Sequence, residues 1–273
     1  MKENKARVIA FYLPQYHPIP ENDKYWGKGF TEWTNVAKAK PLFRGHYQPH
    51  IPADLGFYDL RLPEVREAQA ELARDAGIEG FCYYHYWFGN GKMLLQKPFE
   101  EVLRLGKPDF PFCLCWANHD WTTKTWVKGS SMVNNTMIAQ QEYLGEQDDI
   151  KHFEYCLRAF KDHRYITIEG KPIFLIYDPL SFPNVKEFMN RWNFLAKKNN
   201  LKGIYFIGVT TGRQSSYKIV TNLGFDGVCH NRRWEAEAKA AGFRFVRRMQ
   251  SLLGWHLGIS LMKYDYNKVV RNY

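Results

Sequence analysis

The sequence predicts an α/β fold, a (β/α)8 barrel with about six of its eight βα units present. Short apolar runs alternate along the chain with segments of helical period. The runs are bounded by Gly or Pro and are apolar on both faces, which is typical of parallel strands covered by helices. An open doubly wound sheet has the same order. That fold predicts a Gly-rich phosphate loop after the first strand, where this chain has Pro14-Gln15-Tyr16-His17-Pro18.

Six strands follow from the apolar runs. They are predicted at Val8–Leu13, Phe81–Tyr86, Phe112–Ala117, Ile173–Asp178, Ile204–Val209 and Asp226–His230. A hairpin turning at Glu169-Gly170 is expected ahead of the fourth strand, because Gly readily adopts the left-handed backbone of a tight turn. Polar or aromatic side chains come after every strand, and a barrel gathers such residues on one rim.

Helices are predicted between the strands from apolar stripes and end signals. They cover Pro63–Gly77, Pro98–Leu105, Ile150–Phe160, Val185–Leu195 and Ser215–Leu223, and the closing segment Ser260–Tyr273 also predicts a helix. The long first loop, which holds Tyr25–Asn35, is expected to lack clear structure, and such loops are often functional. No repeat or linker interrupts the chain, so we expect one domain over residues 1–273.

Composition limits the classes of function. The 273 residues are 45% hydrophobic and 24% charged, as in an ordinary soluble protein. No apolar run is long enough for a signal peptide or a spanning helix, which predicts a cytoplasmic protein. The five cysteines show no zinc pattern, and we interpret them as reduced core residues.

The net charge of +10 is uneven along the chain. Residues 232–273 hold nine Lys and Arg against three acids. This stretch is either a solvated basic face or a surface for an anionic partner, such as an anionic sugar donor or a membrane surface in peripheral contact. Nucleic acid is not predicted, because no recognised binding motif accompanies the charge.

Two strands end in an unusual set of side chains. The run that begins at Gly80 ends in His85-Tyr86-Trp87-Phe88, and the run that begins at Phe110 ends in Trp116-Ala117-Asn118-His119-Asp120-Trp121. Aromatic faces beside Asn, His and Asp are what a cleft for an oligo- or polysaccharide needs. The predicted substrate-binding residues are Glu32, Trp33, His85, Trp87, Asn118, His119, Asp120, Trp121 and Asp178.

Other roles for these residues stay open. Glu32 is either an acid or base or a carboxylate bonded to loop backbone. Asp120 and Asp178 are either a glycosidase pair or sugar-binding and capping groups. His85, His119 and His230 could instead be ligands in a metal-dependent barrel hydrolase, but the first strand has no H-x-H, so neither metal nor cofactor is predicted.

These segments together resemble the WbsX family of glycosyltransferases, which is itself similar to glycoside hydrolase family 99. The resemblance covers Ala10–His17, Gly29–Val36, Gln48–His50, Asp54–Tyr58, Ala76–Ile78, Gly80–Phe88, Trp116–Asn118 and Gly170–Phe174. It implies a (β/α)8 barrel that cleaves or transfers glycosidic bonds, often in bacterial surface polysaccharide pathways such as that of lipopolysaccharide.

Two departures limit what the resemblance implies. Many family members continue Glu-Asn-Trp after Trp116-Ala117-Asn118, where this chain has His119-Asp120-Trp121. The late Asn-Glu-Trp-x-Glu motif, whose glutamates are the catalytic pair in glycoside hydrolase family 99, is absent. We therefore expect an incomplete barrel with its catalytic residues unassigned. Three hypotheses remain: an enzyme of this family, a glycan-binding or truncated product without catalysis, or the metal-dependent barrel hydrolase.

Overall fold

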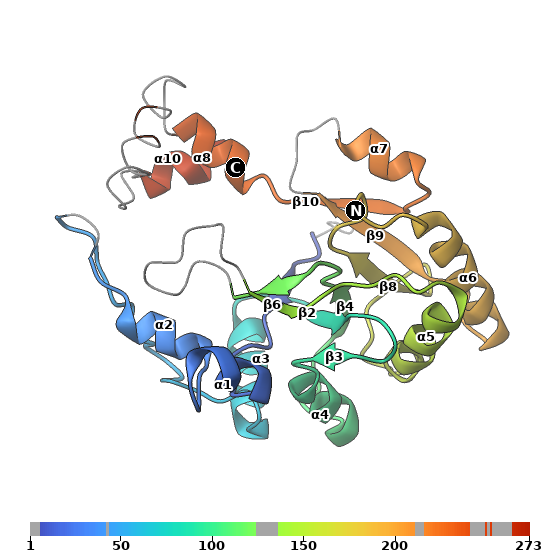
Figure 1. The fold of residues 1–273 in the computed structure, drawn as a ribbon, viewed down its shortest axis with the longest axis horizontal. Helices are drawn as coiled ribbons and strands as arrows, with labels where there is room; N and C mark the ends of the chain where they lie inside the picture. The colour runs from blue at the N-terminus through green and yellow to red at the C-terminus, as the bar shows by residue number, and fades with distance from the viewer. Residues whose placement is uncertain are drawn as a thin grey trace, which may run out of the picture.

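The computed structural model describes residues 6–41, 44–123, 136–210, 216–240, 249, 252 and 264–273. Its centre is a curled sheet of parallel strands in the order β1-β2-β4-β8-β9-β10 (Figure 1). The strands are β1 (Ile9–Tyr12), β2 (Gly80–Trp87), β4 (Phe112–Trp116), β8 (Lys171–Ile176), β9 (Tyr205–Thr210) and β10 (Gly227–His230). Every neighbouring pair is parallel, so the six predicted strands and their α/β arrangement are confirmed.

Helices follow one another around the outside of this sheet (Figure 1). They are α3 (Pro63–Asp75), α4 (Lys97–Leu105), α5 (Glu146–Phe160), α6 (Val185–Lys198) and α7 (Ser216–Asn222), and each matches a predicted helix. Beyond β10 come α8 (Arg233–Ala240) and α10 (Tyr266–Asn272). The closing helix is thus confirmed over its last turns, while residues 260–263 and half of the basic C-terminal stretch lie outside the described residues.

The first long loop is more ordered than the sequence suggested. It contains α1 (Pro20–Trp26) and α2 (Glu32–Lys38). Pro20 stands at the start of α1, where its missing N–H costs nothing, and the Thr31 hydroxyl caps α2 by accepting from the Trp33 N–H at 3.2 Å. Short helices of this kind carry little apolar periodicity, so the expectation of an unstructured loop was wrong.

The predicted hairpin is present. β7 (Thr167–Ile168) pairs antiparallel with β8, and both Glu169 and Gly170 have positive φ, at 54° and 77°. Positive φ at both central residues is the turn that matches the twist of a two-residue hairpin. Two further short pairings, β3 (Met93–Leu94) with β2 and β5 (Trp121–Thr122) with β6 (Met137–Ala139), extend the loops beyond the strand ends.

The strand registers assign each side chain to one face of the sheet. Residues paired in register share a face, and neighbours along a strand alternate. Tyr83 is in register with Tyr12 and Leu114, and these three lie on the outer face under the helices. Trp192 of α6 is fully buried at the centre of the core on this side, at 4.7 Å from the Phe174 ring of β8. The opposite face of the curled sheet is its inner, concave face.

Candidate functional site

The inner face carries a row of partly exposed aromatic side chains across three strands. Phe11 of β1 stacks on Tyr84 of β2, with ring centroids 5.4 Å apart and planes at 19°. Tyr84 in turn meets Tyr177, which directly follows β8, at 5.9 Å. Phe11 is 43% exposed, and Tyr84 and Tyr177 are half-buried. This row, Phe11, Tyr84 and Tyr177, is named the inner aromatic row below.

His119 extends the row at the carboxyl end of the sheet. Its ring lies 5.4 Å from that of Tyr177 and is half-buried. The predicted site residue His119 is therefore placed beside Tyr177, at one end of the inner aromatic row. Burial raises the pKa of the Tyr84 and Tyr177 phenols above the ordinary value, so both stay protonated and can donate as well as accept hydrogen bonds.

A second aromatic pair stands farther along the same face. Tyr86 stacks on Trp121 at 5.9 Å with planes at 23°, and its hydroxyl accepts from the Gln15 side-chain amide at 3.2 Å. Both rings are less than 9% exposed, so they are buried at the carboxyl end of the sheet. The charge of Glu32 contributes to the raised pKa values of Tyr86 and Tyr16, although burial is the larger cause. The carboxylate of Glu32 is thus near enough to act on both phenols.

Trp33 lies in a separate aromatic cluster built by the first loop. Its indole N–H donates to the Tyr58 carbonyl at 2.8 Å, and its ring meets Tyr16 at 4.6 Å and Phe57 at 5.4 Å. Trp33 and Phe57 line a surface cavity of about 510 Å³, in which Phe57 is 53% exposed. Trp33 therefore packs within its own loop and borders a cavity that no residue of the inner aromatic row lines.

His85 and Trp87 lie on the outer face, away from the inner row. The His85 Nε2 atom is 2.8 Å from the His152 Nε2 atom of α5, and Trp87 stacks on the same His152 ring at 4.6 Å. The Trp87 indole N–H donates to the Asp148 carboxylate at 3.1 Å. Burial lowers the pKa of His85 to about 3, so the pair is neutral at pH 7. The structure does not bring these two predicted residues to the concave surface.

Asn118 joins two strand ends as a scaffold. Its side-chain amide donates to the Asp178 carbonyl at 2.8 Å and accepts from the Asp178 N–H at 2.7 Å. It also donates to the Tyr143 hydroxyl at 3.0 Å, and its side chain is 1% exposed. All of these bonds are to the protein, so Asn118 positions the rim and has little surface for a ligand.

Asp120 and Asp178 flank Tyr143 and have local hydrogen-bond partners. The Asp178 carboxylate accepts from the Ser181 hydroxyl at 2.7 Å, and the Asp120 carboxylate accepts from the Gln141 N–H at 2.8 Å. Burial raises the pKa of Tyr143 to about 12, and both carboxylates add to that effect. The two acids thus lie near the Tyr143 phenol. Each also accepts a hydrogen bond within a turn or from a neighbouring loop.

The three histidines considered as metal ligands occupy separate environments. His85 pairs with His152, His119 meets Tyr177, and the His230 Nδ1 atom lies 2.8 Å from the Thr210 hydroxyl. Within the described ranges, the one group of three metal-type donors within 4.8 Å is His85, His152 and Cys156, all buried. Burial keeps His85 and His152 neutral and raises the pKa of the Cys156 thiol. The arrangement is that of a packed core pair.

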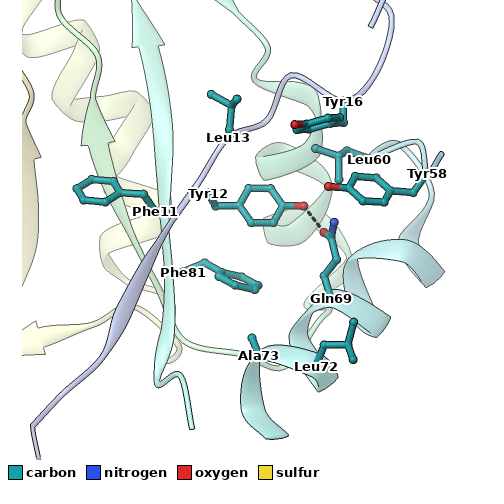
Figure 2. A pocket seen from close by; sticks show the side chains of 10 residues that line it. All are labelled: Phe11, Tyr12, Leu13, Tyr16, Tyr58, Leu60, Gln69, Leu72, Ala73 and Phe81. Atoms are coloured by element: carbon teal, nitrogen blue, oxygen red, sulfur yellow. Dashed lines mark hydrogen bonds between the residues drawn. The ribbon is translucent and has the colours of Figure 1, made fainter. Parts of the chain in front are cut away.

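The residues that sequence reasoning missed are Phe11, Tyr84, Tyr86 and Tyr177. The signal that could have found them is alternation, since Tyr84 and Tyr86 face opposite to Tyr83 and His85 within one strand. Figure 2 shows the same alternation in β1, where Phe11 and Tyr12 project to opposite sides. The Tyr12 hydroxyl donates to the Gln69 side chain of α3 at 2.6 Å, beside an apolar cavity of about 290 Å³ on the outer side.

Comparison with known proteins places the chain in a family. The family model described as Glycosyltransferase WbsX matches residues 8–273. The chain belongs to the WbsX glycosyltransferase family. The protein WxcX of Xanthomonas campestris pv. campestris, in strains B100 and ATCC 33913, is 42% identical over 223 residues. That match covers 82% of this chain and 31% of WxcX, so the chain spans about a third of its curated relative.

One solved structure supports the barrel assignment of this WbsX family member. The endo-α-mannosidase of glycoside hydrolase family 99 from Bacteroides thetaiotaomicron, in complex with bis-tris propane, gives a TM-score of 0.50 at 17% identity. The match covers 92% of this chain and 66% of the mannosidase. A protein described as glycoside hydrolase-like gives a TM-score of 0.49 at 16% identity over 91% of this chain and 67% of its own. The curled parallel sheet is thus consistent with part of a (β/α)8 barrel.

One further property concerns membranes. No helix in the described part of the chain is long and apolar enough to cross a bilayer.

Proposed function

We propose that this protein acts on carbohydrate and that the inner aromatic row binds the glycan during transfer or cleavage of a glycosidic bond in polysaccharide metabolism. The observation that carries the proposal is a concave, partly exposed surface of Phe11, Tyr84 and Tyr177 at the carboxyl side of a barrel-type sheet in a WbsX family member. Aromatic faces pack against the C–H face of a sugar ring, and phenol hydroxyls bond its hydroxyls. Barrel enzymes place their sites at this end of the strands.

The direct test is glycan binding with a matched pair of variants. Saturation-transfer NMR with α-linked mannotetraose, and with the corresponding glucose and rhamnose oligosaccharides, should show binding of at least one. Phe11→Ala should lower that affinity about fivefold, since one stacking contact contributes roughly 1 kcal/mol. Phe194→Ala, which removes a similarly exposed ring from α6 on the outer side, should leave affinity unchanged. Equal loss in both variants, or no binding of any oligosaccharide, would contradict the proposal.

The reaction products distinguish a transferase from a hydrolase. Incubation of a bound oligosaccharide with and without a panel of nucleotide-sugars, followed by mass spectrometry, shows a longer chain for a transferase and a shorter chain for a hydrolase. The motif that supplies the catalytic pair in glycoside hydrolase family 99 is absent from the sequence. That absence favours the second candidate, a glycan-binding role without turnover. Binding without any product would support it, and turnover by this 273-residue chain would refute it.

A further inference from the structure

A cavity of about 340 Å³ lies between the loop that follows β1 and the start of α4. Its polar walls are His17, Glu21, Arg61, Gln96 and Lys97, and its apolar walls include Leu95. The inner aromatic row does not line it. Binding pockets run from about 300 to 1,000 Å³, so this volume is at the lower end and suits a small ligand such as one sugar ring.

His17 is the unexplained side chain in this cavity. It is 1% exposed, and neither ring nitrogen has a hydrogen-bond partner among the described residues. The Pro14 carbonyl has a weak influence on its pKa without the geometry of a hydrogen bond. Nearly all buried polar groups are hydrogen-bonded, because an unmet donor or acceptor costs about 1–3 kcal/mol. A small shift of the ring would let a ligand hydroxyl in the cavity supply a partner for one of the two nitrogens.

The protonation of His17 fits an uncharged ligand. Burial is the main cause that lowers its pKa to about 4, while Asp59 raises it and Arg61 and Lys97 lower it. At pH 7 the ring is therefore neutral, with one N–H donor and one nitrogen acceptor. A sugar hydroxyl can accept from the N–H or donate to the bare nitrogen, whichever of the two it reaches.

The charges around the cavity are balanced rather than basic. The Arg61 guanidinium donates three hydrogen bonds to the Asp59 carboxylate, at 2.6, 3.0 and 3.0 Å, so the Asp59 charge offsets its own. Lys97 and Glu21 carry opposite charges. Within the described chain neither makes a side-chain hydrogen bond. Gln96, at the N-cap of α4, makes no capping bond with its side chain and adds another donor and acceptor. A mixture of donors and acceptors without net charge matches hydroxyl groups better than it matches an anion.

The cavity adjoins the second aromatic pair, Tyr86 and Trp121. Leu94, Leu95 and Ile19, which line it, pack in the same apolar cluster as Tyr86 and Trp121. We propose that this cavity is an accessory subsite that binds one neutral pyranose unit through His17 and Gln96. This inference rests on the proposed function, because it assigns a second sugar position beside the first.

The test observes His17 directly. The full chain is labelled with ¹³C at histidine Cε1, and the His17 signal is identified by its loss in His17→Gln. Titration with methyl α-D-mannopyranoside, methyl α-D-glucopyranoside and methyl α-L-rhamnopyranoside should shift that signal saturably for at least one sugar. Gln96→Ala should weaken that binding about five- to tenfold. His163→Gln, at a histidine whose side chain is 82% exposed, should leave it unchanged.

Several outcomes would overturn the subsite. No shift of the His17 signal with any neutral glycoside would do so, as would tighter binding of methyl glucuronide or inorganic phosphate than of every neutral glycoside. Gln96 is half-buried, so Gln96→Ala reports even if His17→Gln fails to fold. If oligosaccharides bind and respond to Phe11→Ala but not to Gln96→Ala, the subsite fails while the proposed function stands. If no oligosaccharide and no glycoside binds, both fail.

Discussion

The two faces of the sheet use the same residue types for different purposes. On the outer face, His85, Trp87 and Trp192 surround His152, and all four are at most 5% exposed. On the inner face, Phe11, Tyr84 and Tyr177 also contact one another but keep part of their rings in solvent. An aromatic or imidazole ring at a strand end is therefore no indication of a site by itself. What matters is whether helices cover the face on which it lies.

The largest expected effect tests the outer face. Trp192 is fully buried, and its indole N–H donates to the Asp149 carbonyl at 2.9 Å. Trp192→Ala should lower the free energy of unfolding by about 3–5 kcal/mol, because it leaves a large cavity in a close-packed core. Phe194→Ala, two residues along the same helix and 58% exposed, should change it by less than about 0.5 kcal/mol. Urea unfolding measures both, and a cost below about 1 kcal/mol for Trp192→Ala would contradict the core assignment.

Acid should destabilise the protein through its buried histidines. The folded-state pKa is lowered to about 4 for His17 and about 3 for His85, from about 6.5 in the unfolded chain. Below pH 6.5 these two histidines bind more protons in the unfolded state than in the folded state. The free energy of unfolding therefore falls as the pH falls. The loss is about 2 kcal/mol per histidine between pH 6.5 and 5.

Asp149 opposes this trend, so the measurement is a difference between variants. Burial raises its pKa to about 6, and the folded state therefore gains stability as pH falls from 6 toward 4. The free energy of unfolding of His17→Gln should depend less steeply on pH between 6.5 and 5 than that of the wild type. His163→Gln should keep the wild-type slope. Identical slopes in all three proteins would show that His17 titrates normally.

An intermediate effect is expected at the junction of the two faces. Asn118→Ala removes the bonds to the Asp178 backbone and to the Tyr143 hydroxyl and leaves these groups without their partners. The expected cost is about 2–3 kcal/mol of unfolding free energy. Asp120→Asn, at an exposed side chain that keeps an oxygen acceptor for the Gln141 N–H, should cost under about 1 kcal/mol. If the two variants cost the same, Asn118 is not the scaffold described above.

The smallest effect on stability is expected on the inner face. Tyr84→Phe removes one hydroxyl from a half-buried ring and should change the free energy of unfolding by less than about 0.5 kcal/mol. Under the proposed function it should weaken binding of the oligosaccharide about three- to tenfold. Tyr155→Phe, on α5 at the outer side, should leave binding unchanged. Equal effects of both changes on affinity would remove the distinction between the faces.

Local patterns in the sequence were sufficient for the elements of the fold. Apolar runs between Gly and Pro predicted the six strands, and the Glu169-Gly170 turn followed from the conformational preference of Gly. Local patterns were not sufficient for α1 and α2, because helices this short show no apolar periodicity. The structure has His119 beside Tyr177 and Trp121 beside Tyr86, and a role of these residues in binding stays a prediction.

The sequence by itself determined the parallel α/β architecture and the family, because strand periodicity and motifs are local properties. Only the tertiary structure decided the role of each strand-end residue. His85 faces a histidine that lies 67 positions later in the chain, and Asn118 bonds a backbone 60 positions later. Such long-range partners fix which face is covered and which polar atoms are satisfied. For that reason Phe11, Tyr84 and Tyr177 form the aromatic surface of the concave face, and Trp87 is part of the core.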